Sequence, residues 1–289
     1  MKKKIVIPIL IVAAIAILCG CKREEPQTFT GSLLWKVSGN GLSQPSYILG
    51  THHFAEISVL DKIKGFEKAL ASAKTMAGEV MLDDMPAVVR MMMERGLLED
   101  GMTYHDLLSD EDYEFVNNYL TDNLGMGLES LGRFKPAYIT TMLMGDIYTE
   151  AVPDFNALTH KSIDQYIQER SKEAGKEIIG LETAEDQVRV LFDVEPLEVQ
   201  ADNLVESLKD IDTAVDILRK LNACYDNADL DGMYDLSFNN LDESMKVSEE
   251  YEYAINKERN DKWLAKLPGL MSERPLFVAV GALHLAGEE

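Results

Sequence analysis

Two segments at opposite ends of the chain each place a histidine three residues after a glycine that closes an apolar run. Gly50 precedes His53 in the first segment, and Gly281 precedes His284 in the second. The chain has only five histidines, so the repeated Gly-x-x-His spacing indicates a shared site. His52 stands beside His53, and neighbours in an extended chain point to opposite faces. We therefore expect His53 to be the one of this pair that faces the site.

Two glutamates stand in comparable positions. Residues 75–81 have the pattern of a buried strand and contain Glu79, and residues 176–183 form a second such pattern that contains Glu182 near its end. In open α/β sheets, ligands bind beyond the carboxyl ends of the strands. We therefore expect both glutamates and both Gly-x-x-His histidines to converge at one edge of one sheet.

Two histidines with a glutamate suit a divalent transition metal that keeps an open coordination position. Such a metal lowers the pKa of bound water and polarises a carbonyl, and the second glutamate would act as general base or as an outer partner. Other interpretations stay open: the histidines as satisfied polar residues or caps, Glu79 as an ion-paired core carboxylate, and Glu182 as an N-cap in competition with Thr183. The sequence contains no His-Glu-x-x-His, Cys-x-x-Cys or Gly-x-Ser-x-Gly motif.

The elements that must position these residues begin with a predicted hairpin. An apolar segment at 31–38, the turn Gly39-Asn40-Gly41 and the strand before Gly50 carry its pattern. A helical pattern at 61–73 then leads to the strand at 75–81, which predicts a strand–helix–strand unit with a parallel pair.

The rest of the chain is mainly helical in pattern until a last strand that follows Pro275. Helices are expected at 86–98, 109–120, 135–144, 162–174, 202–221 and 248–267, the last ending before Pro268. The prediction is an α/β fold with a mixed central β-sheet, an N-terminal hairpin and a large helical insertion, in one domain over residues 31–289. Met91, Met92, Met93, Met142 and Met144 are interpreted as core residues rather than as an adaptable groove. His105 and His160 are expected at the surface.

Composition argues against nucleic-acid binding. Aspartate and glutamate number 50 against 28 lysines and arginines, for a net charge of −22. A protein that binds phosphate backbones needs a basic surface. An acidic balance of this size favours solubility and like-charge repulsion instead.

The N-terminus has the pattern of a bacterial lipoprotein signal. Residues 1–20 combine three lysines, a short apolar run and a small-residue end, and Leu18-Cys19-Gly20-Cys21 resembles a lipobox. We predict a signal peptide at 1–20, lipidation of Cys21 and a polar tether at 21–30; an ordinary signal peptide or N-terminal anchor is the alternative. Processing at Cys21 would leave Cys224 as the one thiol.

Five ordered blocks resemble the TraB/GumN family. They are Leu33 to Val37, Ser46 to His53, Gly78-Glu79, Ile179 to Gln187, and Glu258-Arg259-Asn260 taken with Val280 to Gly287. The family includes the Tiki metalloproteases, which are tethered to membranes, and it is similar to the erythromycin-esterase and ChaN-like folds. Members usually continue past the last block with a glycine, a helix and a strand, so either the sequence is truncated or this member lacks that element.

The resemblance implies a metal-dependent peptidase in the cell envelope. It assigns metal binding, with manganese, cobalt or zinc as candidates, to His53, Glu79 and His284. Glu182, Arg259 and Asn260 become further site residues, with Arg259 as an electrophilic or carboxylate-orienting group. The alternative for the Arg259-Asn260 pair is a helix-surface contact. The alternative function is an envelope lipoprotein that binds a peptide or a metallated cofactor without catalysis.

Overall fold

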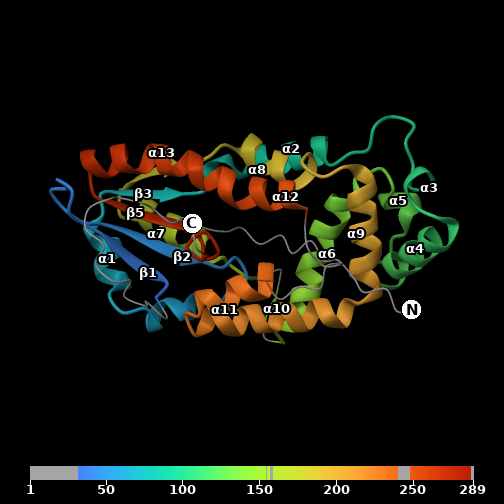
Figure 1. Cartoon of the computed structure of the whole chain (residues 1–289), viewed down its shortest axis with the longest axis horizontal. Helices are drawn as coiled ribbons and strands as arrows, with labels where there is room; N and C mark the ends of the chain where they lie inside the picture. Colours follow the sequence, from blue (N-terminus) through green and yellow to red (C-terminus); the bar gives the residue numbers. More distant parts are fainter. Residues whose placement is uncertain (1–31, 154, 157–158, 240–247, 288–289) are drawn as a thin grey trace.

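The protein is built on a five-stranded sheet in the order β1-β2-β5-β3-β4 (Figure 1). The computed structural model describes residues 32–153, 155–156, 159–239 and 248–287. The predicted signal peptide, Cys21 and the tether lie outside these residues. The strands are β1 (Leu34–Val37), β2 (Ser46–Thr51), β3 (Thr75–Gly78), β4 (Glu177–Gly180) and β5 (Leu276–Gly281).

Helices make up most of the rest. The α-helices are α1 (Phe66–Ser72), α2 (Met85–Arg95), α3 (Tyr104–Leu107), α4 (Asp110–Leu124), α5 (Leu128–Leu131), α6 (Pro136–Ala151), α7 (Ile163–Glu173), α8 (Ala184–Phe192), α9 (Leu197–Lys209), α10 (Ile211–Asp226), α11 (Leu230–Tyr234), α12 (Glu249–Glu252) and α13 (Glu258–Glu273). The described residues also form two 3₁₀ turns, η1 (Ile57–Lys62) and η2 (Leu82–Asp84), and two π turns, η3 (Asp235–Asn239) and η5 (Tyr253–Lys257).

The sheet is mixed, as predicted. β1 and β2 form the antiparallel N-terminal hairpin, and Gly39, Asn40 and Gly41 at its turn all have positive φ. The next three pairings, β2 with β5, β5 with β3 and β3 with β4, are all parallel. The predicted strand–helix–strand unit is present, but β5 lies between β2 and β3. The last strand of the chain therefore occupies the centre of the sheet.

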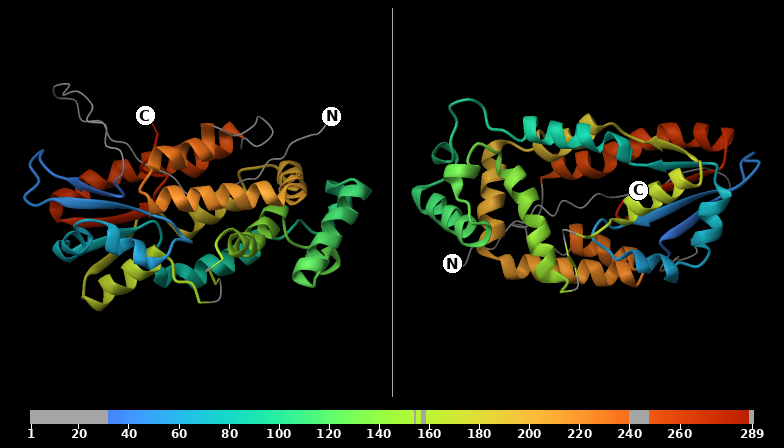
Figure 2. Two further views of the ribbon diagram at one scale, coloured as in Figure 1. Left: turned by 90° about the horizontal axis from the view of Figure 1, so that it is seen from below. Right: turned by 180° about the vertical axis from the view of Figure 1, so that it is seen from behind.

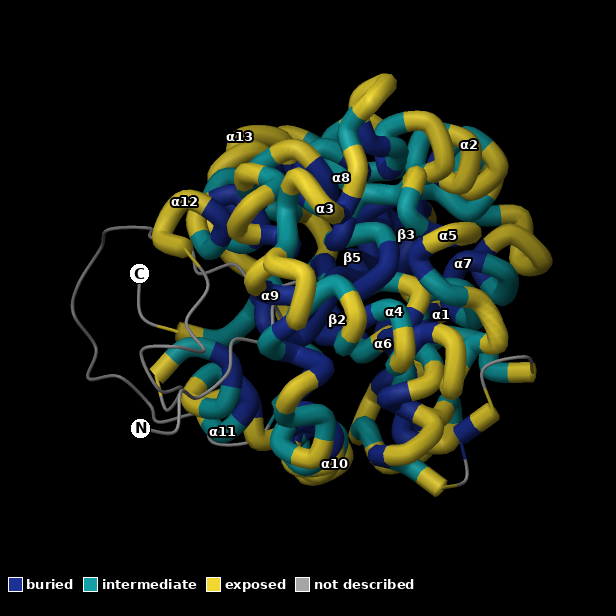
Figure 3. Tube along the Cα trace, turned by 90° about the vertical axis from the view of Figure 1, so that its right-hand side faces the viewer, coloured by how far each residue is buried: buried dark blue, intermediate teal, exposed yellow. Residues whose placement is uncertain are grey.

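Both faces of the central strands are buried. On β5, Val278 and Val280 pack against Trp263 and Leu267 of α13, while Phe277 packs on the opposite side in the cluster that contains α1 and α7. Strands covered on both sides are expected to be continuous apolar runs, which is the pattern of this segment. Figure 3 shows β2, β5 and β3 as the buried centre of the molecule.

The helical insertion comes in two pieces. One lies between β3 and β4 and the other between β4 and β5, and Figure 2 shows α3, α4 and α5 at the end of the molecule far from the hairpin. The predicted helix at 202–221 is divided, because the non-helical backbone of Asp210 separates α9 from α10. The predicted helix end before Pro268 was wrong: Pro268 lies inside α13, which continues to Glu273. Proline removes one backbone hydrogen bond, and burial of Leu267 and Met271 against the sheet holds the helix together past it.

The methionines predicted as core divide into two groups. Met144 is buried, whereas the side chains of Met93 and Met142 are exposed, so the prediction was wrong for these two. Met91 and Met92 pack at the margin of the small apolar cluster between α2 and α8. Exposed methionines on α2 therefore need an explanation other than core packing.

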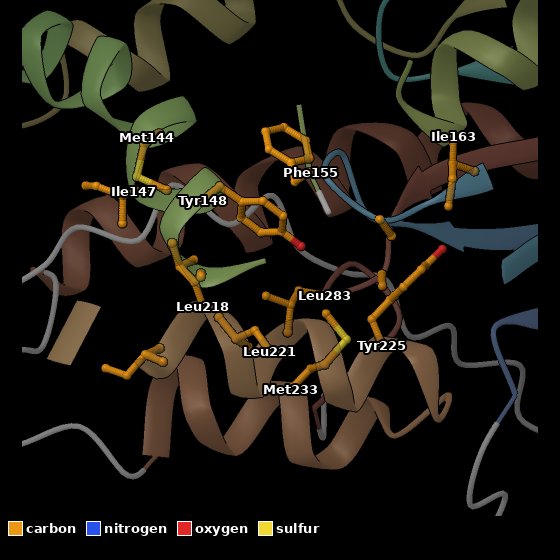
Figure 4. Packing of buried hydrophobic residues seen from close by; sticks show 14 of the residues in the cluster. Met144, Ile147, Tyr148, Phe155, Ile163, Leu218, Leu221, Tyr225, Met233 and Leu283 are labelled. Carbon is orange, nitrogen blue, oxygen red and sulfur yellow. The ribbon is translucent and has the colours of Figure 1, made fainter. Parts of the chain in front are cut away.

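The two Gly-x-x-His segments approach each other closely at Gly50. A Cβ on Gly50 would lie 3.0 Å from the Cα of Ala282, and the Ala282 amide donates to the Thr51 carbonyl at 2.7 Å. Below them, the Tyr225 hydroxyl donates to the Gly50 carbonyl at 3.0 Å. Figure 4 shows Tyr225 and Tyr148 packed around Leu283. Glycine is required at position 50 because any side chain would separate the two segments.

Candidate active site at the carboxyl edge of the sheet

The four predicted residues follow the four parallel strands. His53 comes after β2, His284 after β5, Glu79 after β3 and Glu182 after β4. Neighbouring parallel strands end at one edge, and the backbone continues the pairing there: the Glu182 amide donates to the Glu79 carbonyl at 3.0 Å. The structure therefore places the two histidines and the two glutamates at one edge of the sheet, as expected from the sequence.

Arg259 is the centre of the buried part of this edge. Its Nε and Nη2 donate to the two carboxylate oxygens of Glu182 at 2.9 and 2.5 Å, and Nη2 also donates to Glu79 Oε2 at 2.6 Å. Its Nη1 donates to the Ile255 carbonyl at 3.3 Å and to His284 Nε2 at 3.0 Å. A guanidinium has five N–H donors, so every donor of Arg259 is engaged. It orients carboxylates, and none of its donors is left for a ligand.

The start of α13 presents Arg259 and Asn260 to the same site. Both residues are buried, which differs from a helix-surface pair. The π turn η5 immediately precedes them, and its residue Ile255 supplies the carbonyl that Arg259 contacts. π turns inside helices are frequent at functional sites. A further stabilising contact places the Arg259 guanidinium 4.9 Å from the ring of Trp263.

His284 is fully buried and fully engaged. Arginine can only donate, so His284 Nε2 accepts from Arg259, and Nδ1 carries the proton that it donates to Asn260 Oδ1 at 2.7 Å. Burial lowers the pKa of His284 well below its ordinary value, and the nearby Arg259 and His53 add to this effect. The ring is therefore a neutral imidazole of fixed tautomer, packed 4.2 Å from Trp263.

Glu79 connects the buried network to the cavity. Its Oε1 accepts from the Gly281 amide at 2.7 Å, and its Oε2 accepts from Arg259. Burial raises the pKa of Glu79; Arg259 opposes this and the Glu182 carboxylate supports it. Glu182 is not the helix cap, because Thr183 caps α8. Glu182 instead accepts from Nε and Nη2 of Arg259, and it shares Nη2 with Glu79.

His53 lies at the open side of the site. Its side chain is 50% exposed, and its Nδ1 is 3.0 Å from Asp164 Oδ2. Thr51 donates to the other Asp164 oxygen at 2.6 Å, and His160 donates to the His53 carbonyl at 2.7 Å. Removal from water lowers the pKa of His53, but Asp164 more than compensates and raises it to about 9. His53 is therefore an imidazolium at neutral pH with Nε2 as its second donor.

His52 points to the other side, as predicted. Its ring lies 5.3 Å from the ring of Tyr225 and 6.0 Å from that of Tyr148, and its Nδ1 accepts from the Phe54 amide at 3.1 Å. Burial, with the neighbouring His53, lowers the pKa of His52 to about 3. His52 anchors the segment and takes no part in the cavity.

A cavity of about 960 Å³ gives His53 and Glu79 access to a ligand. Asp164 and Gln187 also contribute to its lining, and His284 does not. The Gln187 amide is 3.4 Å from Glu79 Oε2. The reachable groups of the site are therefore His53, Glu79 and their neighbours, while Arg259, Asn260 and His284 stand behind them.

Sequence reasoning missed Asp164 and misplaced His160. Asp164 is the second residue of α7, and a short polar residue after the Ser162 N-cap looks like ordinary helix-start chemistry. His160 was expected at the surface but is half-buried and holds the His53 backbone. His105 is exposed as expected and stacks on Tyr113. No local pattern reports a contact across more than 100 residues.

The predicted metal ligands are of the residue types that bind metals, but the structure arranges them as hydrogen-bond partners of other protein groups. Both ring nitrogens of His284 and both oxygens of Glu79 already have hydrogen-bond partners. Within the described residues, no three histidine, cysteine, aspartate or glutamate side chains are grouped as a metal site. A metal held by His53, Glu79 and His284 would require Arg259 to release His284 and to leave room between them.

Replacing Asp164 with asparagine is expected to lower the pKa of His53 from about 9 toward the ordinary 6.5, because the adjacent carboxylate is lost. In the wild type the pair stabilises the fold fully below about pH 6.5, and this contribution is lost as the pH rises through about 9. Imidazole NMR titration measures the pKa of His53 in the wild type and in the variant, and urea denaturation at a series of pH values measures the stability. An unchanged His53 pKa in Asp164→Asn, judged beside Asp83→Asn on the exposed η2 turn, would contradict this cause.

The fold and site define an α/β protein with a carboxylate–guanidinium–imidazole cluster at the carboxyl ends of four parallel strands. The chain belongs to the TraB/PrgY/gumN family, which it matches over residues 33–289. Comparisons with curated proteins and with solved structures gave no match. Among the described residues, no helix is long and apolar enough to span a membrane.

Proposed function

We propose that the chain is a hydrolase of the cell envelope that cleaves peptides, with His53 and Glu79 as the reacting groups. The observation that carries the proposal is that these two side chains line one cavity. His53, the proposed acid, lies beside Asp164, which raises its pKa, whereas burial raises the pKa of Glu79, the proposed base. Pairs of titratable groups with diverging environments are typical of acid–base catalysis.

The roles follow from the charge states. Glu79, whose pKa is raised, would take a proton from the water that attacks the substrate carbonyl. His53, an imidazolium at neutral pH, would stabilise the developing oxyanion and then donate a proton to the leaving amine. The hydroxyl of the water ends on the new carboxyl group; Glu79 then releases its proton to solvent and His53 regains one from solvent, so one water is consumed for each bond cleaved. Arg259 holds Glu79 in place, and Asp164 holds His53.

The proposal includes a divalent metal, and metal dependence of the activity can be measured. Manganese, cobalt or zinc held by His53, Glu79 and His284 would polarise the carbonyl, and His284 would join such a site only after Arg259 releases it. Activity lost on chelation and restored by one of the three ions would establish a metal-dependent form; activity unaffected by chelation would exclude it.

The test is cleavage of a fluorogenic peptide library by the full chain and its variants. Glu79→Gln and His53→Ala should each lower the rate by about 10²–10⁴-fold, the usual contribution of a general acid or base. Glu129→Gln, at an exposed position of α5, is the matched control, and its rate should be unchanged. If wild type binds peptides but cleaves none, the chain is a binding protein and the hydrolase proposal is wrong. Equal cleavage by wild type and both site variants would also exclude these roles.

We also propose anchoring to the membrane through a lipid on Cys21. The lipobox pattern of residues 18–21 supports it. On fractionation of cells, the full chain should be found with the membranes, and the Cys21→Ser variant should be found in the soluble fraction. A Cys21→Ser variant that stays with the membranes would exclude lipid attachment at this residue.

A further inference from the structure

The cavity beside Glu79 has an apolar wall. Met81 lies in the segment that follows β3, and Met85, Val88 and Met92 belong to α2. All four residues line the cavity. Val88 is buried in the small cluster between α2 and α8, and Met92 packs at its margin. The wall is therefore anchored from behind, and its methionines line the same cavity as the reacting groups.

The other side of the lining comes from α7 and is polar, but its groups are already paired. Lys172 binds Asp83, and the Gln168 side chain bonds to the backbone of Val80 and Leu82. Polar groups that satisfy each other offer a ligand little new hydrogen bonding. Discrimination among ligands therefore depends on the apolar wall.

The apolar surface continues out of the cavity. Met85, Val89 and Met93 are 40%, 50% and 53% exposed and are spaced four residues apart on α2. Residues spaced by four lie on one side of a helix. Isolated exposed apolar residues need no explanation, but a row that is continuous with a cavity indicates a binding surface.

We propose that Met81, Met85, Val88 and Met92 form the subsite that selects an apolar side chain of the peptide next to the cleaved bond. The inference rests on the proposed function and specifies its substrate class. The occupant is a peptide side chain because the wall and Glu79 line the same cavity, so a peptide bound with its cleaved bond at Glu79 would extend along the wall. Methionine is flexible and polarisable, so the subsite accepts aliphatic and aromatic shapes of differing outline and excludes charged ones.

The test measures which random-sequence peptides the full-length Glu79→Gln variant enriches, in parallel with cleavage by the wild type. Enriched sequences should share one apolar position. Adding Met85→Lys should reduce binding of those peptides by about tenfold or more, the scale for loss of an apolar pocket contact, and should shift enrichment at that position to aspartate or glutamate. Met142→Lys on α6 is the matched control, since Met142 is 38% exposed and does not line the cavity.

The outcomes separate the two ideas. Apolar enrichment that Met85→Lys changes and Met142→Lys does not supports the subsite, even if the wild type cleaves nothing and the hydrolase proposal fails. Cleavage without any apolar preference overturns the subsite and leaves the hydrolase intact. Absence of peptide binding, or peptide binding that is displaced by a fatty acid as strongly as by the enriched peptide, overturns the subsite as a peptide site. The change in preference, rather than loss of binding alone, guards against misfolding of the variant.

Discussion

Replacing Arg259 with methionine is expected to lower the free energy of unfolding by about 3–5 kcal/mol, the range seen when one partner of a buried ion pair is removed. The guanidinium is 4% exposed, and it neutralises two carboxylates that are 6% and 3% exposed. Methionine fills much of the volume but supplies no donor. Glu79 and Glu182 would then be left as buried charges without a counterion, and their mutual repulsion would favour unfolding.

The matched control is Arg189→Met. Arg189 also donates to a glutamate, Glu258, at 2.6 Å, but the pair is 36% and 25% exposed. Partly exposed pairs of this kind contribute about 0–1 kcal/mol. Urea denaturation of both variants gives the comparison. Equal losses for the two arginines would show that the buried cluster carries no special weight.

A second variant tests the cause. Adding Glu79→Gln and Glu182→Gln to Arg259→Met removes the uncompensated charges, so part of the lost stability should return. Continued loss of the full amount would mean that shape and hydrogen bonding, rather than charge, dominate. The combined variant should stay inactive, because Glu79 is a reacting group in the proposed function.

The residues at the carboxyl edge of the sheet could be predicted from the sequence because strand ends have short, local sequence patterns. At each of these four strand ends, a glycine closes the apolar run and a polar side chain follows within three residues. Parallel topology then brings these polar side chains together. The hairpin was predicted for a similar reason, since Gly39 and Gly41 mark a turn with positive φ. Both inferences depend on residues that are neighbours in sequence.

What the sequence could not predict depends on contacts between distant segments. Asp164 meets His53 only because α7 packs beside the sheet, and no local pattern distinguishes it from a helix-start residue. α13 continues through Pro268 because its buried face packs on the sheet, and tertiary packing overrides the local tendency of proline. The exposure of Met93 likewise depends on which neighbours α2 meets. The role of Arg259 in orienting carboxylates follows from the finding that all five of its N–H donors are occupied. Only the three-dimensional contacts reveal this.

Replacing His284 with alanine is expected to lower the free energy of unfolding by about 2–4 kcal/mol, from unpaired buried partners and a cavity beside the lost ring. Asn260 Oδ1 and Arg259 Nη1 would each lose a hydrogen-bond partner. Trp263 would lose the ring that packs 4.2 Å from its own. The exposed His105→Ala is the control, and it should cost about 0.5 kcal/mol or less.

Chelation separates the two roles that His284 could have. A metal ligand stabilises the folded state through the bound metal, so the part of the His284→Ala cost that comes from metal binding should disappear when a chelator is present. A residue that only positions Arg259 and Asn260 costs the same with and without chelator. Because both ring nitrogens are already engaged in buried hydrogen bonds, we expect equal costs. A cost that vanishes on chelation would instead make His284 a ligand and require Arg259 to move when the metal binds.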